Sequence, residues 1–341
     1  MPPEPPKPPD ETGLIIQRMT GLVMLPHGRS PALSEMISRS LVHLQTSKAL
    51  AVPERRGGEE CDFEIAPGVM MRMCWIPPGD FLMGSPEDEL GHYDDETQHQ
   101  VTITRGFWLG KCEVTQAQWE AVMGSNPSHF KGLDLPVECV SWNDIAAPGG
   151  FLEQVNRLAT EGWSFSLPTE AQWEYACRAG TTTALNSGKN LTSTSEVCRN
   201  LDEVAWYDEN SGGRTHPVGG KAANAWGLHD MHGNVCEWCA DGYGAYPTGS
   251  MSDPLGPDSN SDRVSRGGCW NYVALSCRAA ARDDFLPVGD RIPFSCRAAE
   301  HLHYGSDGGF SYGSLSYDSL SYDSNNIGFR IARSSVPHSS R

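Results

Sequence analysis

The chain has 341 residues and a formal net charge of −17, which argues against a nucleic-acid partner and favours binding of cations. Only 20% of its residues are charged, and 36 Gly and 24 Pro interrupt it, which excludes a coiled coil or long-helix bundle and predicts a loop-rich α+β domain. No apolar run reaches the roughly 18 residues of a membrane span, and the first residues lack a signal peptide's apolar segment. We therefore expect a cytoplasmic chain without a membrane partner.

The first 60 residues differ from the rest. Residues 1–12 are rich in Pro and are expected to be a disordered tail. Apolar residues recur at three- and four-residue steps within 13–50 and predict a helical extension, with the clearest helix over Ala32–Ala51. Arg55–Glu60 reads as a linker that completes this extension at residue 60. The extension is either an accessory layer on the main domain or a docking element for a partner protein.

The main domain is predicted over residues 61–334, followed by a tail over 335–341. Alternating or continuous apolar residues predict strands, and Thr caps followed by apolar spacing predict helices. A third helix has a Pro-Gly-Gly interruption near its start, and the chain beyond residue 180 is expected to form short strands and long loops. The strands are predicted at Met70–Ile76 and Gln100–Ile103, and the helices at Thr115–Met123, Trp142–Leu158 and Thr169–Ala176.

The stretch Gly227–Trp238 combines two carboxylates with glycines that let the backbone curl. Hard cations such as Ca²⁺ prefer carboxylate and carbonyl oxygens. The candidate ligands are the side chains of Asp230 and Glu237 and the carbonyls of Gly233 and Val235. The same spacing also suits a surface turn that ends at a buried Trp.

Several motifs occur in one order along the chain. They are Ile76–Ser85, Glu113-Val114-Thr115, Pro136-Val137 with Val140-Ser141-Trp142, Leu167–Glu174, the glycine-rich stretch and Arg266-Gly267-Gly268. Together, over about residues 65–331, they resemble the formylglycine-generating enzyme (sulfatase-modifying factor) family, whose domain is a variant of the C-type lectin fold. The resemblance implies a structural Ca²⁺ on the four oxygens named above, and a weaker second site near Asn200 and Leu201.

Enzymes of this family oxidise a substrate cysteine with copper held by two cysteines. Aligned on Arg266-Gly267-Gly268, the second family cysteine matches Cys277, but the first falls on Tyr272. A neighbouring family serine falls on Cys269. A copper-dependent oxidase would therefore have to use Cys277 and Cys269 at an altered spacing. The alternatives are buried structural thiols and a catalytically inactive family member.

The C-terminal part has an unusual amino-acid composition. From Asn271 to Arg341 there is no Lys, Gln, Met, Trp or Thr, and Glu300 is the one Glu. Tyr, Ser, Gly and Asp dominate, as in antibody binding loops, where Tyr gives rigid contact area and the small polar residues adapt their hydrogen bonds. A flexible low-complexity insertion would have a similar composition.

Five short segments of this part also follow a codon limit: Tyr272-Val273, Leu275-Ser276, Asp283–Leu286, Val288-Gly289 and Ile292–Ser295. Replacing adenines in an AAC codon reaches Tyr, Ser, Asp, Phe, Leu, Val and Ile, among others, but never Lys, Gln, Glu, Met or Trp. Residues 271–330 therefore resemble the variable region of a diversity-generating retroelement target protein, which implies a non-catalytic protein that binds a protein or another macromolecule. The candidate contact residues are Tyr272, Val273, Leu275, Asp283, Asp284, Phe285, Leu286, Val288, Ile292, Phe294, Tyr304, Tyr312, Tyr317 and Tyr322.

Overall fold

The computed structural model describes residues 55–158, 163–257, 262–287 and 325–335. The chain divides into two units at Arg55, and every described residue belongs to the second unit, Arg55–Arg341. The expectations for residues 1–54 and for 336–341 of the tail lie outside the described residues, whereas Ser335, which we placed in the tail, is the last residue of a strand. Glu60, which we placed in a linker, is instead the first residue of a strand.

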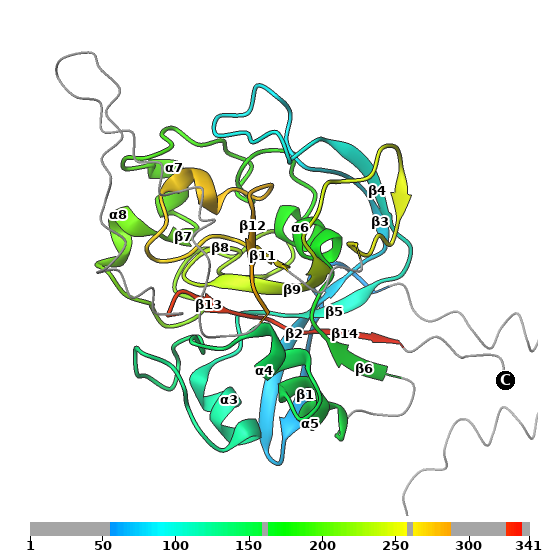
Figure 1. Ribbon diagram of the computed structural model, residues 1–341, viewed down its shortest axis with the longest axis vertical. Helices are drawn as coiled ribbons and strands as arrows, with labels where there is room; N and C mark the ends of the chain where they lie inside the picture. The colour runs from blue at the N-terminus through cyan, green and yellow to red at the C-terminus, as the bar shows by residue number, and fades with distance from the viewer. Residues whose placement is uncertain (1–54, 159–162, 258–261, 288–324, 336–341) are drawn as a thin grey trace, which may run out of the picture. The chain divides into compact units, whose positions relative to one another are not determined.

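A five-stranded sheet carries both the first and the last described strands of the unit (Figure 1). All of its neighbouring strands are antiparallel, and β14 lies between β5 and β6, so the end of the chain returns to the middle of the sheet. The sequence prediction for Met70–Ile76 is confirmed by β2. In spatial order the strands are β1 (Glu60–Ala66), β2 (Val69–Ile76), β5 (Phe107–Gly110), β14 (Ala332–Ser335) and β6 (Trp163–Ser166).

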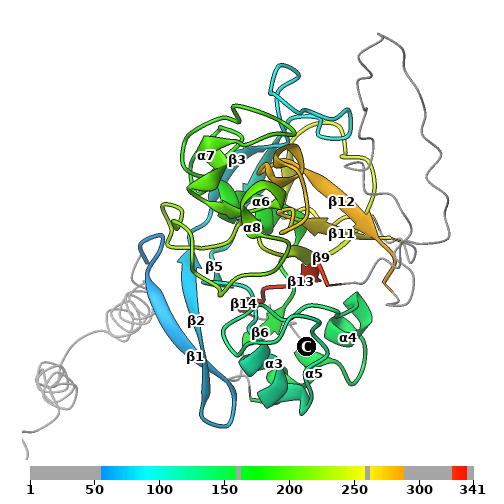
Figure 2. The ribbon, with the colours of Figure 1, turned by 90° about the vertical axis from the view of Figure 1, so that its left-hand side faces the viewer.

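Three smaller sheets complete the β-structure. In the four-stranded sheet, β11 pairs with both β9 and β12, and β13 pairs in parallel with β9 (Figure 2). The four-stranded sheet is β12 (Arg282–Phe285), β11 (Arg263–Arg266), β9 (Cys236–Gly242) and β13 (Ile327–Gly328). The three-stranded sheet is β10 (Met251–Ser252), β4 (His99–Ile103) and β3 (Gly79–Met83), and the two-stranded sheet is β7 (Ala205–Trp206) and β8 (His232–Gly233).

The helices are short and begin where the sequence provides caps. Thr115 and Thr169 each accept a hydrogen bond from the backbone of the third helical residue, as predicted. The helix predicted over Trp142–Leu158 is broken in two, because Gly149 has a φ of 86° between α4 and α5. The helices are α3 (Gln116–Met123), α4 (Trp142–Ala146), α5 (Phe151–Asn156), α6 (Glu170–Arg178), α7 (Arg199–Asp202), α8 (Asp208–Ser211) and the 3₁₀ helix η1 (Ala274–Cys277).

Two hydrophobic clusters form the core. The first contains Trp119, Phe151, Trp238 and Phe329, and the second contains Trp173 and residues of β2 to β5. Helix α6 contacts β3, β4, β9 and β11 and so joins the small sheets to each other. The α+β class and the loop-rich character predicted from the sequence are confirmed. In the described part of the chain, no helix has the length and apolarity needed to cross a membrane.

Buried ion pairs hold the long connections in place. Arg266, Arg278 and Arg330 are among the largest fully buried side chains. Arg266 pairs with Glu174, Arg278 pairs with Glu96 at 2.6 Å, and Arg330 pairs with Glu237 at 2.5 Å. Because losing one partner leaves a buried charge unpaired, each such pair costs about 3–5 kcal/mol to break.

Candidate functional site

The glycine-rich stretch is a buried, tightly curled loop rather than a surface turn. Asp230 and Asn234 both have positive φ, at 54° and 62°, and both side chains are buried. Gly233 has a φ of 75°, and a Cβ atom there would overlap the carbonyl of Trp206. Position 233 therefore requires Gly, since β8 approaches the backbone of β7 too closely for a side chain.

The carboxyl groups of Asp230, Glu113 and Glu237 lie near Arg330 beside this loop, and Glu237 is the one that contacts it. Glu237 accepts hydrogen bonds from Arg330 at 2.5 and 2.6 Å and from the indole N–H of Trp173 at 2.8 Å. Glu113 accepts from Asn234 Nδ2 at 2.9 Å and from the backbone N–H of Val235. The loop thus gathers two negative charges more than its one positive charge if all three carboxyls are ionised.

Asp230 is the incompletely satisfied member of this group. Its Oδ2 accepts a hydrogen bond from the backbone N–H of Gly219 at 2.6 Å, whereas no described group contacts Oδ1. Burial raises the pKa of Asp230. Burial, followed by the charges of Asp230 and Glu237, holds the pKa of Glu113 well above its usual range. A buried acceptor without a donor and an excess of negative charge both favour a bound cation.

Of the two candidate side chains, Asp230 therefore has an oxygen without a described partner that a cation such as Ca²⁺ could bind, whereas both oxygens of Glu237 accept hydrogen bonds from Arg330. Within the described ranges, no three His, Cys, Asp or Glu side chains are arranged as a metal site by themselves, so a cation here depends on backbone oxygens as well. Asp230 and Glu237 with the carbonyls of Gly233 and Val235 would provide that mixed set. The sequence reasoning did not include Glu113 and Arg330, although Glu113 lies in a motif that it used.

The predicted second Ca²⁺ site near Asn200 and Leu201 has fewer groups available to bind a cation. Both residues lie in α7, where the carbonyl of Leu201 already accepts a hydrogen bond from the backbone N–H of Val204. The side-chain amide of Asn200 donates to the carbonyl of Asn190 at 2.8 Å. Leu201 itself is buried in the first core cluster.

The thiols proposed for the oxidase alternative lie in the core. Cys269 and Cys277 are buried, and among the described cysteines no disulfide is formed. The structure adds a third thiol, Cys236 of β9, whose pKa is held well above its usual range by burial and then by the neighbouring Cys269. Burial also holds the pKa of Cys277 well above its usual range. Protonated thiols are poor nucleophiles and poor metal ligands.

Cys236 and Cys239 have the two-residue separation of many metal and redox cysteine pairs. In β9, however, residues three apart point to opposite faces. Cys236 belongs to the first core cluster and Cys239 to the second. The two thiols therefore cannot act together, and each fills its own core.

The structure separates the candidate contact residues into two groups. Tyr272 and Phe285 are 4% and 2% exposed and belong to the first core cluster, and Val273 is buried as well. Phe285 packs edge-to-face on Trp238, with ring centroids 5.8 Å apart. These three side chains differ from our expectation of exposed anchors, because their rings and methyl groups fill the core between η1 and β12. The partly exposed group is Leu275, Asp283, Asp284 and Leu286.

The remaining candidate residues lie outside the described residues. They are Val288, Ile292, Phe294, Tyr304, Tyr312, Tyr317 and Tyr322. In the described part of the variable segment, residues 271–287, two buried arginines near the partly exposed residues are held by ion pairs. Arg278 donates to Glu96 and Glu89, and Arg282 forms two hydrogen bonds to Glu170, at 2.6 and 2.9 Å.

The sheet arrangement and the buried glycine-rich loop define a domain of the formylglycine-generating enzyme type, with its C-type-lectin-like fold. The chain belongs to the family of sulfatase-modifying factor enzyme 1-like domains, whose model matches residues 64–299. This membership confirms the family resemblance that the motifs indicate.

Relatives of this chain carry diverse names. The chaperone protein LppX of Paenibacillus barcinonensis is 35% identical over 215 residues, which cover 50% of this chain and 71% of that protein. The formylglycine-generating enzyme of Mus musculus is 32% identical over 216 residues, which cover 60% of this chain and 54% of the enzyme. The serine/threonine-protein kinase Pkn1 of Chlamydia trachomatis serovar L2 is 30% identical over 259 residues, 70% of this chain and 40% of the kinase. The match thus spans about half or less of the enzyme and the kinase.

Two solved structures share the fold. Treponema denticola variable protein 1 is similar with a TM-score of 0.60 and 28% identity, over 80% of this chain and 98% of that protein. PvdO from Pseudomonas aeruginosa has the same TM-score at 23% identity, over 82% of this chain and 99% of PvdO, and supports the fold alone.

Proposed function

We propose that this chain is a non-catalytic ligand-binding protein that presents variable residues of 271–330 on a lectin-like scaffold, as the target of a diversity-generating retroelement. The observation that carries the proposal is the similarity to Treponema denticola variable protein 1, which extends over 98% of that protein and 80% of this chain. The name of that protein agrees with the codon-limited composition of the segment after Arg266-Gly267-Gly268. The ligand is a protein or another macromolecule.

The contacts of residues 271–287 support a scaffold whose backbone is fixed while some of its side chains vary. Arg278 and Arg282 are buried and ion-paired, while Leu275, Asp283, Asp284 and Leu286 reach the surface between or beside them. Side chains at the surface of a fixed backbone can change with little loss of stability. A binding site can therefore vary at these four positions while the arginines keep the backbone in place.

We propose further that a structural Ca²⁺ stabilises the glycine-rich loop. The unsatisfied Oδ1 of Asp230 and the buried carboxyl of Glu113 near it, whose pKa is raised by burial and then by Asp230, support this assignment. The cation would stabilise the scaffold, and it would have no part in chemistry.

The decisive experiment is sequencing of the gene and its surroundings in many isolates of the source population. We expect a reverse-transcriptase gene and a near-identical template repeat nearby, with substitutions at the codons of Leu275, Asp283, Asp284 and Leu286. The codons of Arg278 and Arg282 should be invariant. An absence of both the template repeat and the reverse transcriptase would contradict the proposal.

A second candidate function is a copper-dependent oxidase of a protein cysteine. Cys277 at the position of a family cysteine, and the 32% identity to the mouse enzyme, are the observations that favour it. Incubation with copper and a cysteine-containing sulfatase peptide, followed by mass spectrometry, distinguishes the two candidates. Conversion of the peptide cysteine to formylglycine would overturn the binding-only proposal.

A further inference from the structure

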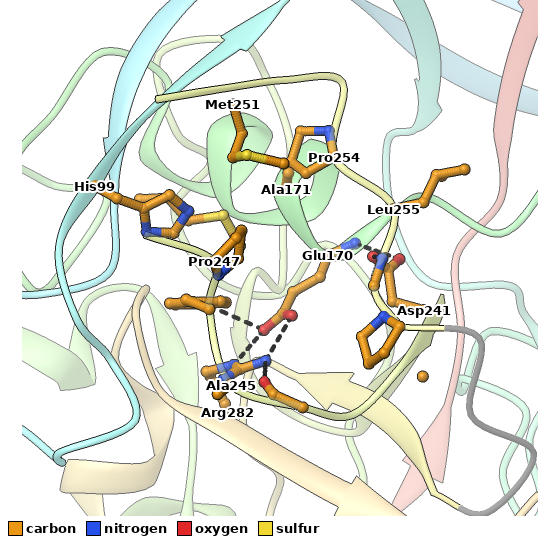
Figure 3. Close-up of a pocket in the computed structure, with 16 residues that line it drawn as sticks. His99, Glu170, Ala171, Asp241, Ala245, Pro247, Met251, Pro254, Leu255 and Arg282 are labelled. Carbon is orange, nitrogen blue, oxygen red and sulfur yellow. Dashed lines mark hydrogen bonds and ion pairs between the residues drawn. The ribbon is translucent and has the colours of Figure 1, made fainter. Parts of the chain in front are cut away.

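A second site, separate from the glycine-rich loop and the four partly exposed positions, lies between α6 and the connection from β9 to β11. It is a cavity of about 260 Å³ with mainly apolar walls, to which Met83 and Tyr246 contribute. Met251 and Leu255 also line it (Figure 3). Leu255 is 77% exposed and stands at its mouth. Since a cavity of about 150 Å³ holds benzene, this one has room for a single ring with a short substituent.

Asp241 is the lining carboxylate that no cationic side chain contacts. It accepts hydrogen bonds from the backbone N–H of Glu170, the first residue of α6, at 2.8 Å and from Gly256 at 2.6 Å. No described Lys, Arg or His lies within ion-pair distance of it. Glu170, by contrast, is held by Arg282 at 2.6 and 2.9 Å and by the hydroxyl of Tyr246. Each oxygen of Asp241 has a lone pair left for a donor.

His99 provides a second acceptor across the cavity, opposite Asp241 (Figure 3). Its Nδ1 lies 3.0 Å from the carbonyl of Thr97, which fixes that nitrogen as the donor and leaves Nε2 as an acceptor. No described residue hydrogen-bonds to Nε2, although the side chain is more than nine-tenths buried. The ring lies against Tyr246, with centroids 4.7 Å apart.

The chemistry of the walls defines the ligand. Among the described lining groups, Asp241 and His99 offer acceptors to an apolar space, so a ligand should donate a hydrogen bond and carry an apolar body. An acid would be repelled by Asp241 and Glu170, and a bare metal ion would leave the apolar walls unfilled. We propose that this cavity binds a small primary amine with one aromatic ring, whose ammonium group lies at Asp241 and whose ring lies among Met83, Tyr246 and Met251. The net charge of −17 also favours cations over anions.

The test compares three probes of equal size by calorimetry at pH 7.5 on the full chain: 2-phenylethylamine, 2-phenylethanol and phenylacetate. We expect the amine to bind at least about tenfold more tightly than the alcohol, because charge-assisted hydrogen bonds are the stronger ones. Phenylacetate should bind the weakest. Equal affinity of amine and alcohol, or no saturable binding of the amine, would overturn the proposal.

Asp241→Asn should abolish the preference for the amine over the alcohol. Asp253→Asn is the matched control, because Asp253 also holds a backbone N–H, that of Thr104, but does not line the cavity. This control should change amine affinity less than twofold. If Asp241→Asn does not fold, His99→Asn tests the same site, since it removes the imidazole ring that packs against Tyr246 where the ligand's ring would lie. We expect a severalfold loss of amine affinity in that variant, and an unchanged affinity would contradict the site.

A pH series gives an independent readout. Burial, followed by the charge of Glu170, raises the pKa of Asp241 to about 6. Amine affinity should therefore fall as the pH is lowered through about 6, where Asp241 gains a proton. Glu170, Arg282, Arg266 and Tyr246 are the other charged or titratable groups near Asp241, with His99 across the cavity. Because Asp241→Asn removes the titrating group, it should flatten this pH dependence.

Discussion

Strands β9 and β12 of the four-stranded sheet differ in how many of their residues can be substituted without loss of stability. Strand β9 and the loop before it are buried almost throughout, and they contain residues with positive φ and a cluster of carboxylates. Strand β12, at the sheet edge, begins with the buried Arg282 and ends with the buried Phe285, and the partly exposed Asp283 and Asp284 lie between them. The first region is buried at nearly every position, whereas β12 is buried only at its first and last residues. Backbone stability and surface variability are thus supplied by different strands of one sheet.

The largest expected effect is the loss of the ion pair that joins β9 to the end of the chain. Arg330→Met leaves Glu237 buried beside Asp230 and Glu113 without its cation and should lower the free energy of unfolding by about 3–5 kcal/mol. Urea unfolding followed by circular dichroism measures this loss. Arg72→Met is the matched control, because Arg72 is 55% exposed and solvent screens its pair with Asp62, so its loss should be far smaller. Equal effects of the two variants would contradict the contrast.

A second prediction tests the buried members of the variable segment. Phe285→Ala should destabilise the protein by about 3 kcal/mol or more, because it opens a cavity beside Trp238. Leu275→Ala and Leu286→Ala should each cost less, about 1 kcal/mol, since their side chains are partly exposed. Thermal unfolding of the three variants ranks them. If Phe285→Ala is the mildest of the three, Phe285 is not a core residue.

Calcium should act on the glycine-rich loop. Adding Ca²⁺ to chelator-treated protein should raise the melting temperature, with a stabilisation of about 2.7 kcal/mol when its concentration is 100 times the dissociation constant. Asp230→Asn should abolish this response, because it replaces the carboxylate whose Oδ1 has no partner. Asp253→Asn should preserve it. A melting temperature indifferent to Ca²⁺ in the parent protein would remove the cation from the proposal.

The smallest effect is a pH dependence of the metal-free protein. The pKa values of Glu113 and Asp230 are raised in the folded state, so above about pH 4 the folded chain retains protons that the unfolded chain has lost. Their contribution to stability therefore falls as the pH rises from about 4 towards neutrality. Glu113→Gln removes one titrating proton and should make this fall shallower, by at most about 1.4 kcal/mol for each step of one in pH. Urea unfolding at a series of pH values measures the two slopes. An identical slope in the variant and the parent protein would show that Glu113 does not titrate in this range.

The sequence predicted the scaffold well because its signals are local. The Thr caps of α3 and α6 and the apolar run of β2 each depend on a few adjacent residues. The break between α4 and α5 was not predicted, because the Pro-Gly-Gly sequence ends the first helix rather than merely weakening it.

The site could be predicted only in part, because its remaining contacts join distant residues. Glu113 is more than 100 residues from Asp230 in sequence, and neither residue's spacing indicates that burial forces the two carboxyls together. Phe285 is of a residue type common in binding surfaces, but the side of the strand on which its ring packs depends on the register of β11 and β12. Tyr272 lies outside the strands, and its burial depends on the core around it. The thiols of Cys236 and Cys269 also lie close together although they come from separate segments of the chain.

The two edges of the four-stranded sheet are occupied by β12, which ends at Phe285, and by β13, which begins at Ile327. The chain on either side of residues 288–324 is thus anchored independently, in one case through Trp238 and in the other through pairing with Cys236 and Glu237. Doubling the length of a connection between fixed ends costs only ~0.6 kcal/mol. A change in chain length between Phe285 and Ile327 therefore leaves both strand pairings intact, so relatives can differ in length here without loss of the sheet.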